Sequence, residues 1–148
     1  MRLQEEGAEV VTVGPNKETV TGKNALEAQA DATADEVDAA TFNGVVIPGG
    51  WAPDKLRRYP KITDLVKTVH ERGKPVGIIC HGGLVAISAG IVDGSRATGS
   101  LGIRDDLVNA GATWVDEAAF RDGNLVWGRV VADIPDFNRE LVAALSGA

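Results

Sequence analysis

The sequence contains few residues of several types, and each scarcity excludes a class of site or of partner. It has one cysteine, so no disulfide can form within it, and its two histidines are too few for a zinc site. Basic residues number 15 against 21 acidic ones, and the net charge of −6 argues against a nucleic-acid partner. No apolar run could cross a bilayer, and the first residues do not resemble a signal peptide. We therefore expect a cytoplasmic protein with no metal, no cofactor, no nucleic-acid partner and no membrane contact.

What the chain does contain is the composition of a folded domain. Hydrophobic residues make up 44% of its 148 residues and charged residues 24%, which are ordinary globular values. This length predicts a single domain over residues 1–148, large enough to bury a core. Glycine is abundant, with 18 residues, which is typical of α/β proteins with many tight turns.

Short apolar runs alternate with helical patterns along the chain. Gly44–Pro48 and Val76–Ile79 predict buried parallel strands, and apolar residues at helical spacing predict a helix over Lys61–Arg72. A hairpin is predicted around Gly123. The other expected elements are strands at Ala8–Val13, Ala97–Thr98 and Thr113–Val115, and helices at Asp31–Ala40, Pro53–Arg58, Leu84–Ala89, Ile103–Ala110 and Pro135 to about Leu145. This alternation predicts an α/β fold with a mostly parallel sheet.

The most informative stretch is Val76–Gly83, which reads Val-Gly-Ile-Ile-Cys-His-Gly-Gly. A strand that ends in a cysteine and turns through glycines into a helix presents a nucleophile at the carboxyl edge of a sheet. The helix N-terminus favours the thiolate form of Cys80, and His81 can serve as general acid or base. A lone cysteine is more often a small buried hydrophobe. The combination with His81, the glycines and both flanking elements favours a nucleophile elbow.

A second glycine pair, Gly49–Gly50, follows the predicted strand at Gly44–Pro48. Its backbone N–H groups could face a cavity and form an oxyanion hole. A plain strand-to-helix turn explains the same spacing, so both interpretations stay open here.

These stretches resemble the PfpI family of intracellular cysteine proteases and amidases, within the class I glutamine amidotransferase-like superfamily. The resemblance spans nearly the whole chain in order and is carried by Val45–Gly50, Ile78–Gly82, Ser88–Gly90, Asp105–Gly111, Trp114–Asp116 and Asp122–Asn124. It implies a flavodoxin-like three-layer α/β/α sandwich with a nucleophile elbow. It also implies a homodimer or a higher homo-oligomer.

Carried over residue by residue, the resemblance implies that Cys80 is the nucleophile and His81 the catalytic acid or base. The backbone N–H groups of Gly50 and His81 match the oxyanion hole. Asp54 falls where the family usually has a glutamate that reaches the histidine across a subunit interface. An acid in the first turn of a helix is also explained by the helix dipole, so this second interpretation of Asp54 stays open.

The start of the chain departs from the family pattern. Family members begin with a core strand and a glycine-rich loop whose glutamate contacts the nucleophile, whereas Met1–Gly7 matches the end of the helix that follows that loop. The resemblance therefore predicts that this strand and its glutamate are missing. On that interpretation another element fills the strand's place, or the natural protein starts before Met1.

Three functions compete on these residues. The first is a cysteine-dependent hydrolase acting on peptides or amides, which the adjacent His81 and the available Asp54 favour. The second is a cofactor-free glyoxalase or deglycase acting on small reactive aldehydes, against which the missing glutamate counts. The third is a redox-sensing or chaperone-like stress protein with an oxidisable thiol. Trp51 lies between Gly50 and Asp54, so of the three tryptophans it alone is considered as a ligand contact.

Overall fold

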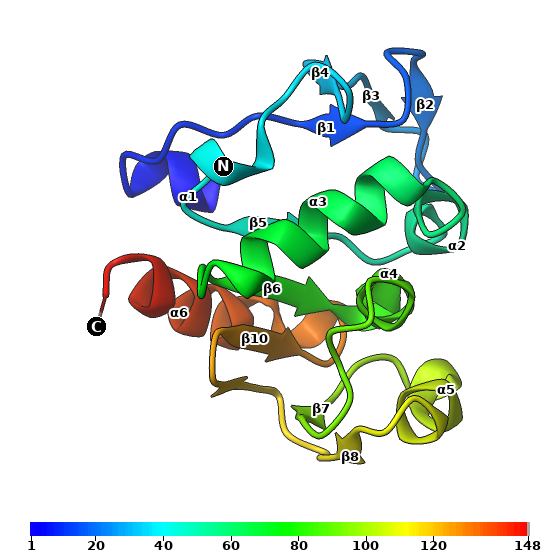
Figure 1. The fold of residues 1–148 in the computed structure, drawn as a ribbon, viewed down its shortest axis with the longest axis vertical. Coiled ribbons are helices and arrows are strands. Elements are labelled where there is room, and N and C mark those ends of the chain that lie inside the picture. Colours follow the sequence, from blue (N-terminus) through cyan, green and yellow to red (C-terminus); the bar gives the residue numbers. More distant parts are fainter. Residues whose placement is uncertain (148) are drawn as a thin grey trace.

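The computed structural model describes residues 1–147, and a four-stranded sheet forms its centre. The strand order is β5 (Val45–Ile47), β6 (Val76–Ile79), β10 (Leu125–Gly128) and β9 (Ala119–Asp122). The first three strands are parallel, and β9 is antiparallel to β10, as predicted for the hairpin. Figure 1 shows these strands stacked through the middle of the molecule.

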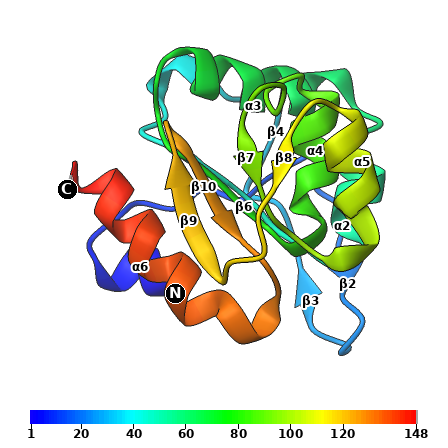
Figure 2. The ribbon, with the colours of Figure 1, turned by 90° about the horizontal axis from the view of Figure 1, so that it is seen from below.

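Helices cover both faces of this sheet. One face carries α2 (Ala52–Leu56), α3 (Pro60–Glu71), α4 (Gly83–Ser88) and α5 (Arg104–Asn109), and the other carries α6 (Ile134–Leu145) (Figure 2). Each of these helices was predicted to within two residues at both ends. The chain therefore has the predicted α/β/α layers around a mostly parallel sheet.

The alternation of side chains along β6 explains why two helical layers form. Val76 and Ile78 point into the main core and are completely buried. Gly77, between them, faces α6, where a Cβ would lie 3.0 Å from Leu141 Cδ1 and 3.1 Å from Phe137 Cζ. Successive residues of a strand point to opposite faces, so one apolar run supplies both sides of the sheet.

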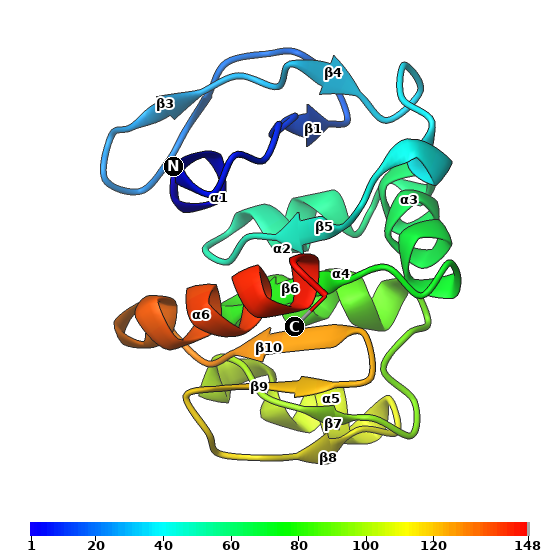
Figure 3. The same ribbon diagram turned by 90° about the vertical axis from the view of Figure 1, so that its left-hand side faces the viewer.

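The remaining strands form three two-stranded ribbons. They are β1 (Val13–Gly14) with β4 (Ala32–Thr33), β2 (Val20–Thr21) with β3 (Glu27–Ala28), and β7 (Arg96–Ala97) with β8 (Thr113–Trp114). Short helical segments are α1 (Arg2–Glu5), η1 (Ala39–Thr41), η2 (Cys80–Gly82), η3 (Leu101–Ile103) and η4 (Val131–Asp133). Figure 3 shows the β1–β4 ribbon beside β5, although β1 pairs only with β4 and β5 only with β6 among the described strands.

Two element predictions near the start are wrong. The expected strand over Ala8–Val13 is reduced to Val13–Gly14, because the residues before Val13 have no ladder partner in the described chain. The expected helix over Asp31–Ala40 is replaced by β4 and η1. Here the Asp31 carboxylate accepts a hydrogen bond from the Thr12 N–H at 2.8 Å, and the Asp38 carboxylate accepts one from the Ala40 N–H at 2.9 Å. The acidic residues of this segment thus cap turns.

None of the helices within residues 1–147 is long and apolar enough to cross a membrane.

Candidate active site

The corner after β6 is the most strained part of the central sheet. Cys80 begins η2, which leads directly into α4. Its φ is +58°, and Ala25 is the one other non-glycine residue with positive φ in the described chain. A left-handed backbone is unfavourable for a residue with a Cβ, and such strain concentrates at functional sites. The sharp strand-to-helix corner predicted at Cys80 is therefore present.

Cys80 and His81 form a side-chain pair at this corner. Cys80 Sγ lies 3.4 Å from His81 Nδ1, within hydrogen-bonding reach for sulfur. Both residues are partly buried, so solvent still reaches the pair. A thiol beside an imidazole can pass its proton to the ring and become a nucleophile. The geometry fits the chemistry expected of these two residues.

The backbone of the turn after β5 touches the nucleophile. A Cβ on Gly49 would lie 2.8 Å from Cys80 Cβ and 3.3 Å from Cys80 Sγ, so a side chain at residue 49 collides with the cysteine. Gly50 follows with φ of +69°, a conformation that glycine adopts readily, and the chain then enters α2. The turn singled out in the sequence therefore contacts Cys80 through Gly49, and the role of the Gly50 N–H in an oxyanion hole stays a prediction.

Asp54 is not joined to this pair within one chain. It lies in the first turn of α2, and its carboxylate forms an ion pair with the Arg58 guanidinium one turn later. Its side chain is 56% exposed. Within residues 1–147 no hydrogen bond links Asp54 to His81. One chain brings together Cys80, His81 and the Gly49–Gly50 turn, and leaves Asp54 facing outward.

Trp51 lies beside the His81 ring. Its ring centroid is 6.4 Å from that of His81, with 36° between the ring planes. The indole is 74% exposed. The sequence indicated only that Trp51 falls between two site residues, and its approach to the His81 ring follows from the turn at Gly50.

A cavity of about 400 Å³ lies near the corner. It is lined by Gly99, Leu101, Arg104, Trp114, Asp116, Arg129 and Val130. A Cβ on Gly99 would lie 2.7 Å from the Cys80 carbonyl oxygen, so one residue that lines the cavity packs against the backbone of the nucleophile. Its volume is within the range of small-molecule sites.

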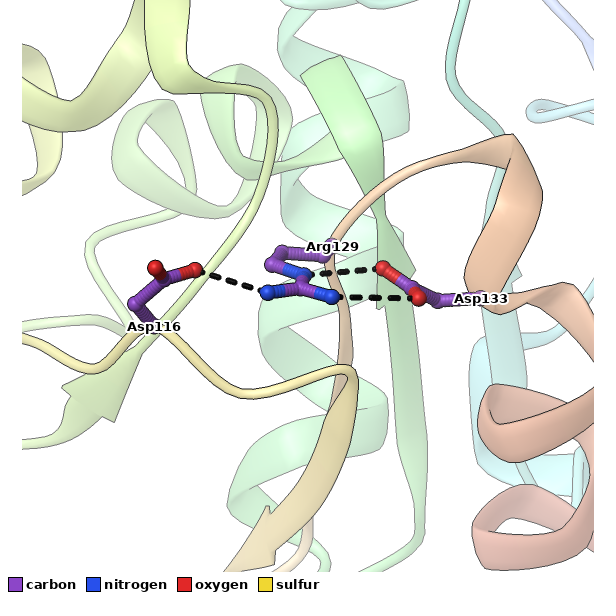
Figure 4. A network of polar contacts seen from close by, with 3 residues as sticks. All are labelled: Asp116, Arg129 and Asp133. Atoms are coloured by element: carbon purple, nitrogen blue, oxygen red, sulfur yellow. Dashed lines mark hydrogen bonds and ion pairs between the residues drawn. The ribbon is translucent and has the colours of Figure 1, made fainter.

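Two residues that line the cavity, Asp116 and Arg129, belong to an ion-pair network. Arg129 follows β10, and its guanidinium lies between the carboxylates of Asp116 and Asp133 (Figure 4). Arg129 Nε and Nη2 donate to Asp133 at 2.9 and 3.2 Å, and Nη1 donates to Asp116 at 2.9 Å. The hydrogen bonds from Arg129 hold the pKa of Asp133 below its ordinary value, and the two carboxylates raise the pKa of Arg129. Sequence reasoning missed this network, although Arg129 and Asp133 stand four residues apart, a spacing that could have indicated their ion pair. Asp116 is distant from both in the sequence.

No group of three or more histidine, cysteine, aspartate or glutamate side chains in residues 1–147 is placed to hold a metal ion.

A strained cysteine corner after a central strand, with a histidine beside it, defines the α/β sandwich proteins that carry a nucleophile elbow. Comparison with known proteins specifies the family. The model of the DJ-1/PfpI family matches residues 1–144, and the chain belongs to that family, within the class I glutamine amidotransferase-like superfamily. The resemblance stated from the motifs is confirmed.

Individual relatives span most of the chain. The deglycase PfpI of Pyrococcus furiosus is 41% identical over 144 residues, which cover 97% of this chain and 87% of that protein. YraA of Bacillus subtilis, which carries a provisional cysteine-protease name, is 39% identical over 139 residues, covering 93% and 82%. Among solved structures, a two-domain protein of Anabaena variabilis with DJ-1/ThiJ/PfpI-like and ferritin-like domains matches with a TM-score of 0.95 and 41% identity. The match covers 98% of this chain but only 42% of that longer one.

Proposed function

We propose that this protein is a cofactor-free deglycase that acts on reactive aldehydes and their adducts through Cys80. The observation that carries the proposal is the Cys80–His81 pair, 3.4 Å apart at the strained corner and in contact with the Gly49 backbone. Similarity to a relative named as a deglycase supports this chemistry over the peptide hydrolysis that the motifs favoured first.

The proposed reaction uses Cys80 as the nucleophile and His81 as the group that carries protons. For methylglyoxal, the Cys80 thiolate adds to the aldehyde carbon and forms a hemithioacetal, while His81 holds the thiol proton. In an amine adduct, the thiolate displaces the amine at that carbon and the amine leaves with a proton. A proton then moves from C1 to C2, which oxidises the aldehyde carbon, reduces the ketone carbon and gives a lactoyl thioester. Water cleaves the thioester to lactate and the free thiol, so the overall reaction is methylglyoxal plus water to lactate plus a proton.

Oxygen anions form at two of these steps. The proposal assigns their stabilisation to the backbone N–H groups of Gly50 and His81, since preorganised donors of this kind are worth a factor of roughly 10²–10³ in rate. Gly50 occupies the turn whose preceding residue touches Cys80, which supports this role.

The test is lactate production from methylglyoxal and from its adduct with N-acetyl-lysine, compared between the wild type and Cys80→Ser. Lactate is followed because free methylglyoxal also disappears by spontaneous reaction with amines. We expect lactate and released amine with the wild type and neither with Cys80→Ser. Equal lactate from both proteins would show that Cys80 does not carry the reaction.

A cysteine peptidase or amidase is the second candidate. Adjacent cysteine and histidine side chains suit acyl transfer, and the name of YraA points the same way. A fluorogenic peptide supplied to the same two proteins distinguishes the candidates. Peptide cleavage that requires Cys80, without lactate formation, would replace the deglycase proposal with this one.

The proposal gives Asp54 a role only in an oligomer, where it would act on a second copy of the chain. It is outward-facing and has no link to His81 of its own chain in the described residues, so an orienting role requires a neighbouring subunit. We therefore include a homodimer or a higher homo-oligomer in the proposal. The single cysteine fits a reducing compartment, and the proposed location is the cytoplasm.

A further inference from the structure

Trp51 differs from the other two tryptophans in its surroundings. Trp127 is completely buried in the main core, and Trp114 is partly buried and packs against the same core. Trp51 is 74% exposed, so most of its indole surface contacts nothing in the described chain. Burying a large solvent-exposed aromatic ring against another molecule is favourable, and such rings mark contact sites for ligands or partners.

The position of this ring connects it to the Cys80–His81 pair. Trp51 follows Gly50 directly and precedes α2, and its ring is 6.4 Å from the His81 ring. The base of α2 is fixed, because Pro53 is buried and Arg57 Nε donates a hydrogen bond to Ser88 Oγ of α4 at 2.9 Å. The backbone next to Trp51 is therefore held by rigid neighbours, as a residue that positions substrate requires.

The cavity near this corner has a mixed lining. Leu101, which is 72% exposed, lines it together with the charged residues Arg104, Asp116 and Arg129. The Trp51 indole, in contrast, offers a charged substituent no compensation for its lost water, whereas it favours an aromatic or large aliphatic one.

We infer that Trp51 is a specificity-determining residue: its indole binds the apolar, preferably aromatic, group carried by the carbonyl next to the carbon that Cys80 attacks. The substrate class is then an α-oxoaldehyde with an aryl or bulky alkyl substituent, and phenylglyoxal is its simplest aromatic member. The inference rests on the proposed function for the identity of the substrate, but the contact itself can be measured without turnover.

Two α-bromoketones test the contact directly. Bromoacetone and 2-bromoacetophenone carry the same electrophilic carbon, and they differ by a methyl or a phenyl group on the carbonyl. In each reaction the Cys80 sulfur forms the C–S bond, the C–Br bond breaks and bromide leaves. Cys80 is the only cysteine, so intact mass reports its alkylation. Each rate is divided by the rate of the same reagent with glutathione, which removes the intrinsic difference between the reagents.

After this correction we expect the wild type to prefer the phenyl reagent by roughly tenfold, equivalent to ~1.4 kcal/mol. In Trp51→Ala the preference falls to about onefold, and in Trp51→Phe most of it remains, because aromatic contact is retained. Tyr59→Ala is the matched control, because Tyr59 is also an exposed aromatic residue, 44% exposed, and lies at the start of α3. Its preference should equal that of the wild type.

An unchanged preference in Trp51→Ala, or none in the wild type, overturns the inference. So does a Trp51→Ala variant whose oligomer size changes on gel filtration while the preference stays, since Trp51 then serves an interface between copies. A different result would show that the proposed function is wrong: methylglyoxal would give no Cys80-dependent lactate, and phenylglyoxal no Cys80-dependent mandelate. The alkylation preference would still measure the contact of Trp51 with the reagent.

Discussion

Replacing Gly49 by alanine tests how closely the backbone of the β5–α2 turn fits against the nucleophile. A Cβ at this residue would lie 2.8 Å from Cys80 Cβ, whereas ordinary van der Waals contact begins at 3.4 Å. The cysteine or the turn must therefore move by the difference, 3.4 minus 2.8, or 0.6 Å. The backbone of Gly49 has no positive φ, so the expected effect comes from the collision alone.

The magnitude follows from that displacement. Overpacking of this kind costs ~1–3 kcal/mol. For a chain of this size, the melting temperature should fall by roughly 3–10 °C. A misplacement of about 1 Å at a reacting centre costs on the order of a hundredfold in rate, so we expect the turnover and the alkylation rate of Cys80 to fall by a factor between ~10 and ~100. Calorimetry and iodoacetamide labelling followed by mass measure the two effects.

Two alanine variants serve as controls. Gly77→Ala places a Cβ 3.0 Å from Leu141 Cδ1 on the α6 face, so it should lose stability without a specific loss of Cys80 reactivity. Gly22→Ala, far along the chain from the site, meets only the Leu26 carbonyl oxygen, at the ordinary contact distance of 3.5 Å, and should change neither property. If Gly49→Ala alkylates at the wild-type rate, or if Gly77→Ala slows Cys80 equally, the close fit at Gly49 does not control the nucleophile.

Three further outcomes are expected. Asp133→Asn should lower the melting temperature by about 2–4 °C near neutral pH. Arg129 lowers the pKa of Asp133, so the ionised carboxylate stabilises the fold at pH values above its ordinary pKa of 3.8. In calorimetry across pH, the difference between the variant and the wild type should vanish as the pH falls through the lowered pKa. In urea unfolding, Cys80→Gly should be more stable than Cys80→Ala by about 1 kcal/mol, because glycine adopts a φ of +58° without strain. Equal stabilities of the two variants would show that the backbone at residue 80 is not strained. Mixing Cys80→Ser with Asp54→Ala subunits should restore part of the lactate production if Asp54 acts on a neighbouring copy, whereas exchange of subunits without recovery would limit Asp54 to its own chain or to no role.

Local patterns were sufficient to predict the central part of the fold. The Val-Gly-Ile-Ile run gives β6 at its observed bounds, because a strand buried on both faces needs an unbroken apolar run. The helical spacing of apolar residues gives α3, and Gly123 marks the β9–β10 turn. The Cys80 corner was predictable for the same reason: its strand, turn and helix are contiguous in the sequence.

Contacts between distant segments could not be predicted in this way. Asp31 lies in a stretch that favours a helix, but its carboxylate accepts a hydrogen bond from the Thr12 N–H, 19 residues earlier. The Arg129 network likewise depends on the return of the chain past Asp116. The exposure of Trp51 and the separation of Asp54 from His81 depend on the direction in which α2 leaves Gly50. These features require the fold to be known first.

On these proposals, the reactivity of Cys80 and the choice of substrate depend on different residues of the site. Variants of Gly49 and of Trp51 should therefore have different effects. The backbone contact of Gly49 positions the Cys80 side chain, whichever compound is attacked. The Trp51 indole lies beside the His81 ring and is otherwise mostly exposed to solvent, so its removal leaves the Cys80 corner in place. Gly49→Ala should therefore slow bromoacetone and 2-bromoacetophenone by the same factor, whereas Trp51→Ala should slow mainly the phenyl reagent. A change of preference in Gly49→Ala as large as that in Trp51→Ala would show that one structural element controls both properties.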